Sequence, residues 1–209
     1  MQFSATTIII IITSIVSIVA LNQHQIFDLL KFNPYRMKHN KEAWRILTGG
    51  FLHADYIHLF MNMFVLYNFG QFIENYIIKM MHDKQSGLIT YLLFYLSAVV
   101  ISGIYTYEKN KENLFYNAVG VSGAVSAIVF AFIVIFPFQS LYLLFIPFPI
   151  PAIVFGILYL LYSAYMAKQA KDNIGHDAHF FGAVYGLLFI LILQPSLLKA
   201  LISQIQIRF

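Results

Sequence analysis

The stretch SGAVSAIVFAFIVIF, residues 122–136, decides how this chain folds. It contains no charged residue, and its only polar side chains are those of Ser122 and Ser126. An uncharged apolar run of this kind favours a helix that spans a membrane. The small residues at its start let a neighbouring helix approach closely. A serine in such surroundings is costly and needs a reason, because its hydroxyl group requires a hydrogen-bond partner.

The whole chain has the composition of an integral membrane protein. Of its 209 residues, 60% are hydrophobic and 11% are charged, and the mean hydropathy is +0.73. A soluble domain of this length carries more charge. The absence of cysteine excludes disulfides and thiolate metal sites. The 13 basic and 9 acidic residues fit contact with the anionic headgroups of a lipid bilayer, and this modest excess argues against nucleic acid as a partner.

We predict an all-α membrane protein, a single domain over residues 1–209 that forms a bundle of six transmembrane helices. A helix that crosses the hydrocarbon core needs about 20 mostly apolar residues. The predicted spans are Ala5–Leu21, Ile57–Ile78, Leu88–Tyr105, Ser122–Phe136, Ile150–Ala167 and His179–Leu193. The first span is expected to be retained, because no basic segment precedes it and no small-residue cleavage site stands out.

Three connecting segments are distinctive. Residues 22–45 are too charged to span a membrane and too rich in aromatic residues and leucine for a bare linker, which predicts an interfacial first loop with short helical pieces. The prolines between Pro137 and Pro151 predict a turn. The tail after Pro195 is amphipathic, and we expect it at the membrane surface.

The number of spans places four polar side chains at a similar depth. Spans two, four and six all start from the same face of the membrane. His58 and Asn62 lie in the first turns of span two, Ser122 begins span four, and His179 begins span six. A hydroxyl group beside an imidazole can act as a nucleophile with its general base.

Each of these residues also has a structural interpretation. The small residues around Ser122 favour helix packing, but a helix N-terminus also offers free backbone N–H groups that suit an oxyanion. His58 and Asn62 are four residues apart on one helix face, so they can satisfy each other or donate hydrogen bonds to an oxyanion. Asp177 can orient His179, although a solvated loop charge is the simpler interpretation.

Other kinds of site use the same residue types. His58 and His179 with a third histidine can hold zinc, but no His-Glu-x-x-His motif is present and the only acid inside a predicted span is Glu74, near the other end of span two. A haem held by the same two histidines leaves Ser122 without a role. We therefore predict no metal and no cofactor, and we interpret His53 as structural.

Taken together, the polar motifs resemble those of the rhomboid family of intramembrane serine proteases. The motifs are Trp44-Arg45, His53-x4-His58-x3-Asn62, Gly120-Val121-Ser122-Gly123 and Ala178-His179-x2-Gly182-x3-Gly186. The apolar loop Leu144-Phe145-Ile146-Pro147 is also similar to the family. Each motif is weak alone, but their order on six spans is specific.

The resemblance implies a Ser–His dyad, with Ser122 as the nucleophile and His179 as the general base. It also implies that His58, Asn62 and the backbone N–H of Ser122 form the oxyanion hole. The substrate is then the transmembrane helix of another protein, cut near the membrane boundary where it unwinds. Family members admit substrate laterally, and the implied gate and cap are span five and the loop Lys168–Asp177.

The chain departs from the family at one position in this pattern. Four residues after the serine, well-studied members carry an aromatic residue that stacks on the catalytic histidine, whereas this chain has Ser126. Either another aromatic residue supports His179, or the dyad is held more loosely.

The family places the active site on the extracytoplasmic side, with the N-terminus in the cytoplasm. This orientation is opposed by the positive-inside rule, because nine Lys and Arg residues lie outside and four inside. Those outside are Lys31, Arg36, Lys38, Lys41, Arg45, Lys109, Lys111, Lys168 and Lys171, and those inside are Lys79, Lys84, Lys199 and Arg208. We follow the family, since a loop-charge count ignores the interfacial character of the first loop, and we expect a multi-pass protein of a bacterial plasma membrane.

Two alternative functions are left open. A catalytically inactive rhomboid-like protein binds membrane clients without cutting them, but such proteins typically lack the serine or the histidine, and both are present here. A transporter or cofactor-binding bundle requires a group that the sequence does not demand. The sequence indicates neither the cleavage motif nor the oligomeric state.

Overall fold

The computed structural model of the chain describes residues 4–142, 148–169 and 174–208, which are mostly helical. The loop 144–147 and part of the implied cap Lys168–Asp177 lie outside these residues. The helices are α1 (Ala5–Asn22), α2 (His24–Leu30), α3 (Pro34–His39), α4 (Arg45–Thr48), the 3-10 turn η1 (Gly49–Phe51), α5 (Tyr56–Met81), α6 (Lys84–Asn110), α7 (Ser122–Ile135), α8 (Ala152–Gln169), α9 (His176–Leu193) and α10 (Ser196–Arg208). Strands β1 (Ser140–Leu141) and β2 (Ile150–Pro151) form an antiparallel hairpin between α7 and α8.

Four of the six predicted spans correspond to helices that are long and apolar enough to cross a membrane, namely α1, α6, α8 and α9. Helix α8 begins at Ala152 rather than Ile150, because Ile150 and Pro151 pair with β1. Helix α5 has 26 residues but carries too many polar side chains to belong to this group. Helix α7 is apolar but has only 14 residues. The six-span arrangement therefore stays a prediction, as does the membrane depth of the short helices between α1 and α5.

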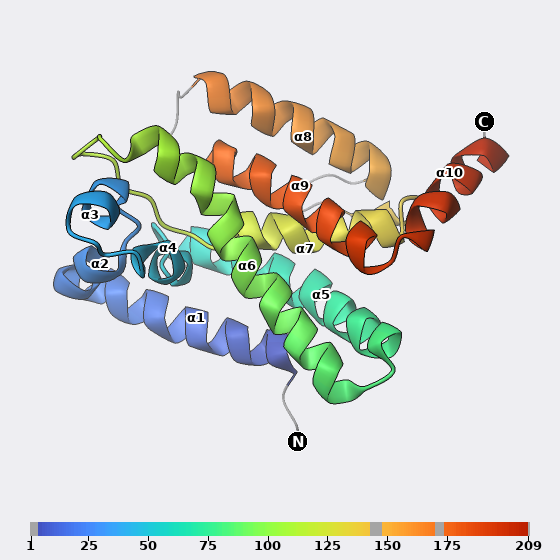
Figure 1. Cartoon of the computed structure of the whole chain (residues 1–209), viewed down its shortest axis with the longest axis horizontal. Helices are drawn as coiled ribbons and strands as arrows, with labels where there is room; N and C mark the ends of the chain where they lie inside the picture. The colour runs from blue at the N-terminus through green and yellow to red at the C-terminus, as the bar shows by residue number, and fades with distance from the viewer. Residues whose placement is uncertain (1–3, 143–147, 170–173, 209) are drawn as a thin grey trace.

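Helix α7 forms the centre of the bundle. All its residues from Gly123 to Ile135 are buried. It packs against α5, α6, α8 and α9, and Figure 1 shows it enclosed among these helices, with α8 at the edge of the bundle. A helix that is apolar on every side is stable only when it is surrounded. The burial of α7 thus explains why the stretch 122–136 organises the fold.

Two glycines let α9 lie directly on α7. A Cβ atom on Gly182 would be 2.0 Å from the backbone oxygen of Gly123, and one on Gly186 would be 1.9 Å from that of Ala127. Atoms cannot approach to these distances, so any side chain at either position forces the helices apart. The spacing of four residues places both glycines on one face of α9.

Helix α1 is fastened to α5 by the buried carboxylate of Glu74, which the sequence places inside a span. Its oxygens accept hydrogen bonds from the backbone N–H groups of Ala5 and Thr6 (both 2.8 Å) and from the Thr6 hydroxyl (2.7 Å). The first N–H groups of a helix have no partner within the helix and carry partial positive charge. Glu74 satisfies these groups in α1 and therefore holds α1 against α5.

We predict that Gly186→Ala lowers the free energy of unfolding by about 3 kcal/mol or more, because the added methyl group meets backbone that cannot move aside. The measurement is a denaturant titration of the purified protein in detergent micelles. Gly175→Ala is the matched control, since among the residues that the structure describes a Cβ atom there meets only Ala178 Cβ, at 3.8 Å. We expect the control to lose less than about 1 kcal/mol. Equal losses in the two variants would contradict the close approach of α7 and α9.

Candidate active site

Ser122 and His179 are joined by a hydrogen bond between two helix starts. Ser122 is the first residue of α7, and His179 lies in the first turn of α9, where its backbone N–H donates to Gly175 O (3.0 Å). The distance from His179 Nε2 to Ser122 Oγ is 2.8 Å. Both side chains are half-buried. A hydroxyl group at this distance from an imidazole nitrogen can pass its proton to that nitrogen as it attacks a carbonyl carbon.

The backbone before Ser122 takes a turn that requires glycine. Gly120 has φ +120°, a conformation that residues with a side chain rarely adopt. Its backbone N–H donates to Gly49 O (3.0 Å), which fixes the turn to η1, shortly after the first loop. The N-cap of α7 is Val121, which makes no side-chain cap. The first N–H groups of α7, including that of Ser122, therefore have no partner within the helix.

The His58 imidazole lies beside this turn. The place where a Cβ atom of residue 120 would stand is 2.9 Å from His58 Cε1, 3.3 Å from His58 Nε2 and 3.9 Å from Ser122 Oγ. His58 Nδ1 accepts a long hydrogen bond from Ala54 N (3.5 Å), which assigns the ring proton to Nε2. The structure thus brings His58 to the Ser122 side of the bundle, with its Nε2 close to Gly120.

His53 packs against His58 and is wholly buried. Its ring meets that of His58 edge-on, with centroids 4.9 Å apart, and its Nδ1 lies 3.2 Å from the Ser17 hydroxyl of α1. Burial, followed by the neighbouring His58, lowers the pKa of His53 to about 3. His53 is therefore neutral at physiological pH, in keeping with a structural residue that steadies the His58 ring.

Asn62 is buried one turn after His58 on α5. Its Nδ2 donates to the backbone oxygen of His58 (3.0 Å), which leaves its second N–H hydrogen for another acceptor. No hydrogen bond joins Asn62 to Ser122 or His179 in the part of the chain that the structure describes. Within those residues, no group of three or more histidine or acidic side chains is placed to hold a metal ion.

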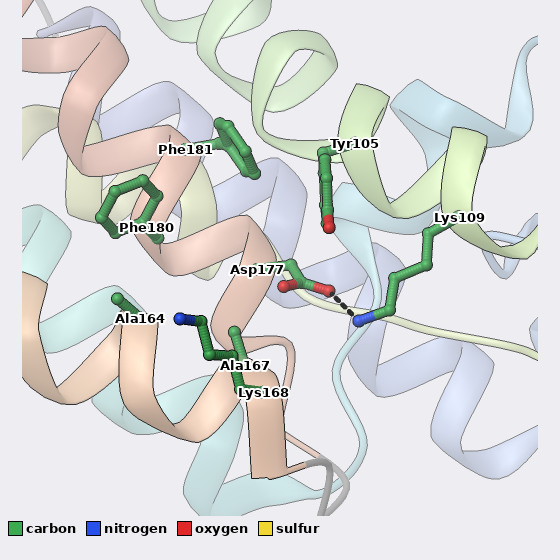
Figure 2. A pocket seen from close by; sticks show the side chains of 8 residues that line it. All are labelled: Tyr105, Lys109, Ala164, Ala167, Lys168, Asp177, Phe180 and Phe181. Atoms are coloured by element: carbon green, nitrogen blue, oxygen red, sulfur yellow. Dashed lines mark hydrogen bonds and ion pairs between the residues drawn. The ribbon is translucent and has the colours of Figure 1, made fainter.

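Asp177 pairs with Lys109 of α6 (2.9 Å) and is directed toward that helix. This ion pair borders a pocket of about 420 Å³ between α6, α8 and α9, also lined by Tyr105, Lys168 and Phe181 (Figure 2). The pocket lies next to the start of α9 but is not lined by Ser122 or His179. The ion pair with Lys109 agrees with the simpler interpretation of Asp177, a loop charge.

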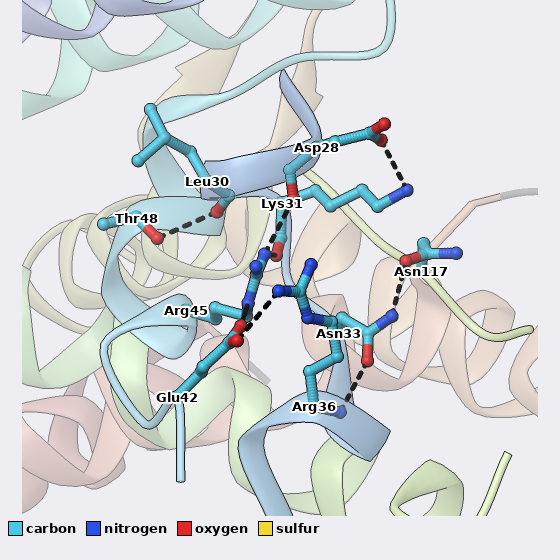
Figure 3. A network of polar contacts seen from close by, with 9 residues as sticks. All are labelled: Asp28, Leu30, Lys31, Asn33, Arg36, Glu42, Arg45, Thr48 and Asn117. Carbon is cyan, nitrogen blue, oxygen red and sulfur yellow. Dashed lines mark hydrogen bonds and ion pairs between the residues drawn. The ribbon is translucent and has the colours of Figure 1, made fainter. Parts of the chain in front are cut away.

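The first loop is organised around the fully buried guanidinium group of Arg45. This group donates to the backbone oxygens of Asp28 and Lys31 (both 2.9 Å) and to the Glu42 carboxylate (Figure 3). Arg36 donates to the other oxygen of Glu42 (2.8 Å). Burial raises the pKa of the Glu42 carboxyl group, but the hydrogen bonds from the two arginines outweigh it and hold the pKa below its usual value.

This loop in turn holds the segment that leads into α7. Three contacts connect the two: the backbone bridge between Phe32 and Ala118 (3.1 and 3.0 Å), the hydrogen bond from Asn33 Nδ2 to Asn117 Oδ1 (2.9 Å), and the hydrogen bond from Gly120 N to Gly49 O. Gly49 is itself tightly packed, since a Cβ atom there would be 2.7 Å from Phe32 N. The first loop therefore fixes the backbone that positions Ser122.

Sequence reasoning left the aromatic neighbour of His179 undecided, and the structure identifies it. Tyr159 of α8 lies over the His179 ring, with ring centroids 6.2 Å apart and an angle of 27° between the planes. Its hydroxyl group is 2.6 Å from the hydroxyl group of Ser126. Ser126, which stands where the family has an aromatic residue, is thus hydrogen-bonded to Tyr159, the aromatic residue that lies over His179.

The Rhomboid domain family model matches residues 40–196 of the chain, which include Ser122, His179, His58 and Asn62. The chain belongs to the rhomboid family. The match also covers Arg45 and the loop segment after it, so this rhomboid-family chain carries the Trp44-Arg45 motif inside the matched domain.

Two curated relatives are similar to this rhomboid-family chain. One, named "RHOMBOID-like protein 12, mitochondrial", comes from Arabidopsis thaliana and is 30% identical over 146 residues, which are 66% of this chain and 43% of the relative. The other, named "Putative rhomboid protease YdcA", comes from Bacillus subtilis (strain 168) and is 29% identical over 157 residues, which are 71% of this chain and 66% of the relative. The chain therefore spans less than two thirds of the length of each.

We predict that Arg45→Met lowers the free energy of unfolding by about 2 kcal/mol or more, because it removes the hydrogen bonds that a buried charge makes to the Glu42 carboxylate and to the backbone oxygens of Asp28 and Lys31. Arg36→Met is the matched control: Arg36 pairs with the same carboxylate, but its side chain is 40% exposed, and an exposed ion pair contributes about 1 kcal/mol at most. Denaturant titration in detergent measures both variants. If Arg36→Met proved as damaging as Arg45→Met, Arg45 would not be the centre of the loop.

Proposed function

We propose that this rhomboid-family chain is an intramembrane serine endopeptidase that cleaves transmembrane helices of other proteins with a Ser–His dyad. The observation that carries the proposal is the 2.8 Å contact between His179 Nε2 and Ser122 Oγ at the start of α7. The chain also retains both residues that inactive members typically lack. The name of the Bacillus subtilis relative, which includes the word protease, agrees with the proposal.

In the proposed acylation step, Ser122 Oγ attacks the carbonyl carbon of the scissile peptide bond. His179 Nε2 accepts the hydroxyl proton as the new C–O bond forms and then donates it to the leaving amine. The peptide C–N bond breaks, and the acyl group stays on Ser122 as an ester. In the second step His179 takes a proton from water as the water oxygen attacks the ester carbon. The ester bond to Ser122 Oγ then breaks, the carboxylic acid product leaves, and His179 returns the proton to Ser122 Oγ.

The oxyanion that forms in each step needs hydrogen-bond donors placed in advance. We assign this role to the backbone N–H of Ser122, to His58 Nε2 and to the second N–H hydrogen of Asn62. The first is supported by its place at a helix start, and the second by the closeness of His58 Nε2 to Gly120. The third is supported by the N–H hydrogen that Asn62 has left after its bond to His58 O.

The proposed substrate is a transmembrane helix that unwinds near the membrane boundary. A carbonyl group inside a helix is hydrogen-bonded and shielded, so Ser122 can attack only an unwound segment. Water must also reach the dyad to release the acyl-enzyme. Both requirements favour a nucleophile that stands at the end of a short helix, below the membrane surface but open to one aqueous side.

The same proposal includes six spans. Helix α5 is about 39 Å long by its residue count, which exceeds a hydrocarbon core of about 30 Å. Two of its polar residues, Asn62 and Glu74, are buried within the bundle, so these two are not exposed to lipid. Helix α7 measures only about 21 Å, and its neighbours shield it from lipid along its whole length. Ser122, at one end of α7, is then recessed within the membrane.

We predict that Ser122→Ala and His179→Ala each abolish cleavage of a model transmembrane substrate in liposomes, because either change removes the nucleophile or its base. Ser122→Ala also abolishes covalent labelling by a fluorophosphonate probe. Ser203→Ala and His24→Ala are matched controls, since both residues are exposed and distant from the dyad in sequence, and we expect wild-type rates from them.

A wild-type protein that folds but is never labelled at Ser122, while a known rhomboid protease is labelled in parallel, would overturn the proposed activity. Binding of the model substrate without cleavage would then favour the inactive, client-binding alternative.

For orientation, we propose that the dyad faces the extracytoplasmic side. Of the eight cations assigned to that side that the structure describes, six form ion pairs with neighbouring acids, which reduces their attraction to an anionic cytoplasmic leaflet. These cations are Lys31, Arg36, Lys38, Arg45, Lys109 and Lys111.

We predict that Gln25→Cys in α2 reacts with a membrane-impermeant maleimide in intact cells, whereas Gln85→Cys in α6 reacts only after lysis. Both glutamines are exposed, and they lie near opposite ends of the bundle. The wild-type chain has no cysteine and is the unlabelled control. The reverse labelling pattern would place the dyad on the cytoplasmic side and leave the proposed chemistry untouched.

A further inference from the structure

A chain of hydrogen bonds connects α8 to the nucleophile. The Ser126 hydroxyl donates to the backbone oxygen of Ser122 (2.8 Å). A hydroxyl group has only one proton to donate, so Ser126 must accept the proton of the Tyr159 hydroxyl group, 2.6 Å away. Tyr159 therefore donates to Ser126, and Ser126 donates to the first turn of α7. Ser126 is 5% exposed, which makes an unpaired hydroxyl group there costly.

The Tyr159 ring is held from several sides. One face lies over His179, with centroids 6.2 Å apart and planes 27° from parallel. Phe130 of α7 and Phe155, one turn earlier on α8, contact the ring at centroid distances of 5.6 and 5.7 Å. Aromatic rings at such separations gain energy beyond the area they bury, and they restrict each other's rotation. These contacts fix the position of the Tyr159 ring and therefore also its orientation relative to the His179 ring.

We infer that Tyr159 is a positioning residue for His179, anchored by Ser126, so that α8 rather than α7 supplies the support for the catalytic base. The inference rests on the proposed function, because it gives Tyr159 a role in the Ser–His dyad. In place of the aromatic residue expected four positions after Ser122, this chain has two residues that act together. They are Ser126 on α7 and Tyr159, which reaches Ser126 from α8.

The origin of this support matters because α8 has fewer buried residues than α1, α5, α6, α7 or α9. Only Ala152, Gly156 and Ser163 are buried among its residues. By contrast, α9 lies on α7 through backbone contacts at two glycines. If α8 moves outward, the ring leaves His179 and Ser126 loses its donor in the same movement. The Tyr159 side chain thereby couples the position of α8, at the lateral boundary of the site, to the orientation of the His179 ring.

The test measures the rate at which a small fluorophosphonate labels Ser122 in the full-length protein in liposomes, across a range of pH. This probe reports on the dyad without requiring a helix substrate to enter. We expect Tyr159→Leu to slow labelling about 3-fold to 10-fold, the scale of one aromatic contact. We also expect it to move the pH at which labelling is half-maximal, since the ring that covers His179 is lost. His176, whose ring is 5.9 Å from that of His179, is unchanged in every variant.

The matched control is Tyr165→Leu, which makes the same change on the same helix at a side chain that is 60% exposed. It should leave the labelling rate and the pH profile at wild-type values. Unfolding midpoints of both variants in detergent show whether either has lost its fold. Tyr159→Phe keeps the ring, and we expect it to restore the wild-type pH profile while slowing labelling less than Tyr159→Leu.

A double-mutant cycle tests the anchor. Tyr159→Phe and Ser126→Ala each remove the hydrogen bond between the two hydroxyl groups, and we expect each to slow labelling by about 5-fold or less. If the two residues act as one unit, the double variant is no slower than the slower single variant. Losses that multiply would show that Ser126 and Tyr159 act independently and would overturn the anchor.

The failures of the two proposals are distinguishable. If wild-type protein is labelled and cleaves substrate, but Tyr159→Leu matches Tyr165→Leu in rate and pH profile, Tyr159 has no positioning role and the dyad stands. If wild-type protein is never labelled, the proposed function fails, and the role of Tyr159 falls with it.

Discussion

Helices α7 and α9 touch through backbone atoms, because Gly182 and Gly186 present no side chain to Gly123 and Ala127. A contact of this kind fixes the register of two helices far more strictly than side-chain packing does, since a shift of either helix drives backbone into backbone. Ser122 stands one residue before this contact, in the first turn of α7. The distance between the hydroxyl group and the imidazole is therefore a consequence of how the two helices pack, and rigid elements hold reactive groups more accurately than loops do.

The first turn of α7 depends on other segments of the chain for its backbone conformation. The N-cap residue of α7 is Val121, whose apolar side chain cannot accept a hydrogen bond from the first N–H groups of the helix. The first loop supplies this order through backbone contacts, from the bridge at Ala118 to the hydrogen bond at Gly120. Arg45, buried in the loop, holds the loop's own carbonyl groups. The polar residues that precede α5 thus influence the position of Ser122, the proposed nucleophile, through backbone contacts.

The sequence predicted those features that depend on local pattern. Hydropathy located the apolar helices, the spacing of Gly182 and Gly186 predicted the tight face of α9, and counting spans brought Ser122 and His179 to one end. Pattern alone could not identify Tyr159. Helix α8 carries several aromatic residues at helical spacing, and which of them meets His179 depends on the rotation of α8 about its axis, a tertiary property. Whether α7 crosses the bilayer stays a prediction, because burial among other helices lets a 14-residue helix be apolar on every side.

Helices α9 and α8 meet the centre of the bundle in different physical ways. The glycine contacts hold the backbones of α9 and α7 directly together, so α9 cannot shift along α7 without a steric clash. The contacts of α8 run through aromatic side chains and one pair of hydroxyl groups, and they can break and re-form without a change in helix register. Under the proposed function, the first kind of contact suits the attachment of the base, and the second suits a helix that yields to an incoming substrate. Because Tyr159 reaches from α8 to His179 on α9, the inferred support of His179 comes from the adjustable edge of the bundle, whereas an aromatic residue at position 126 would supply it from α7.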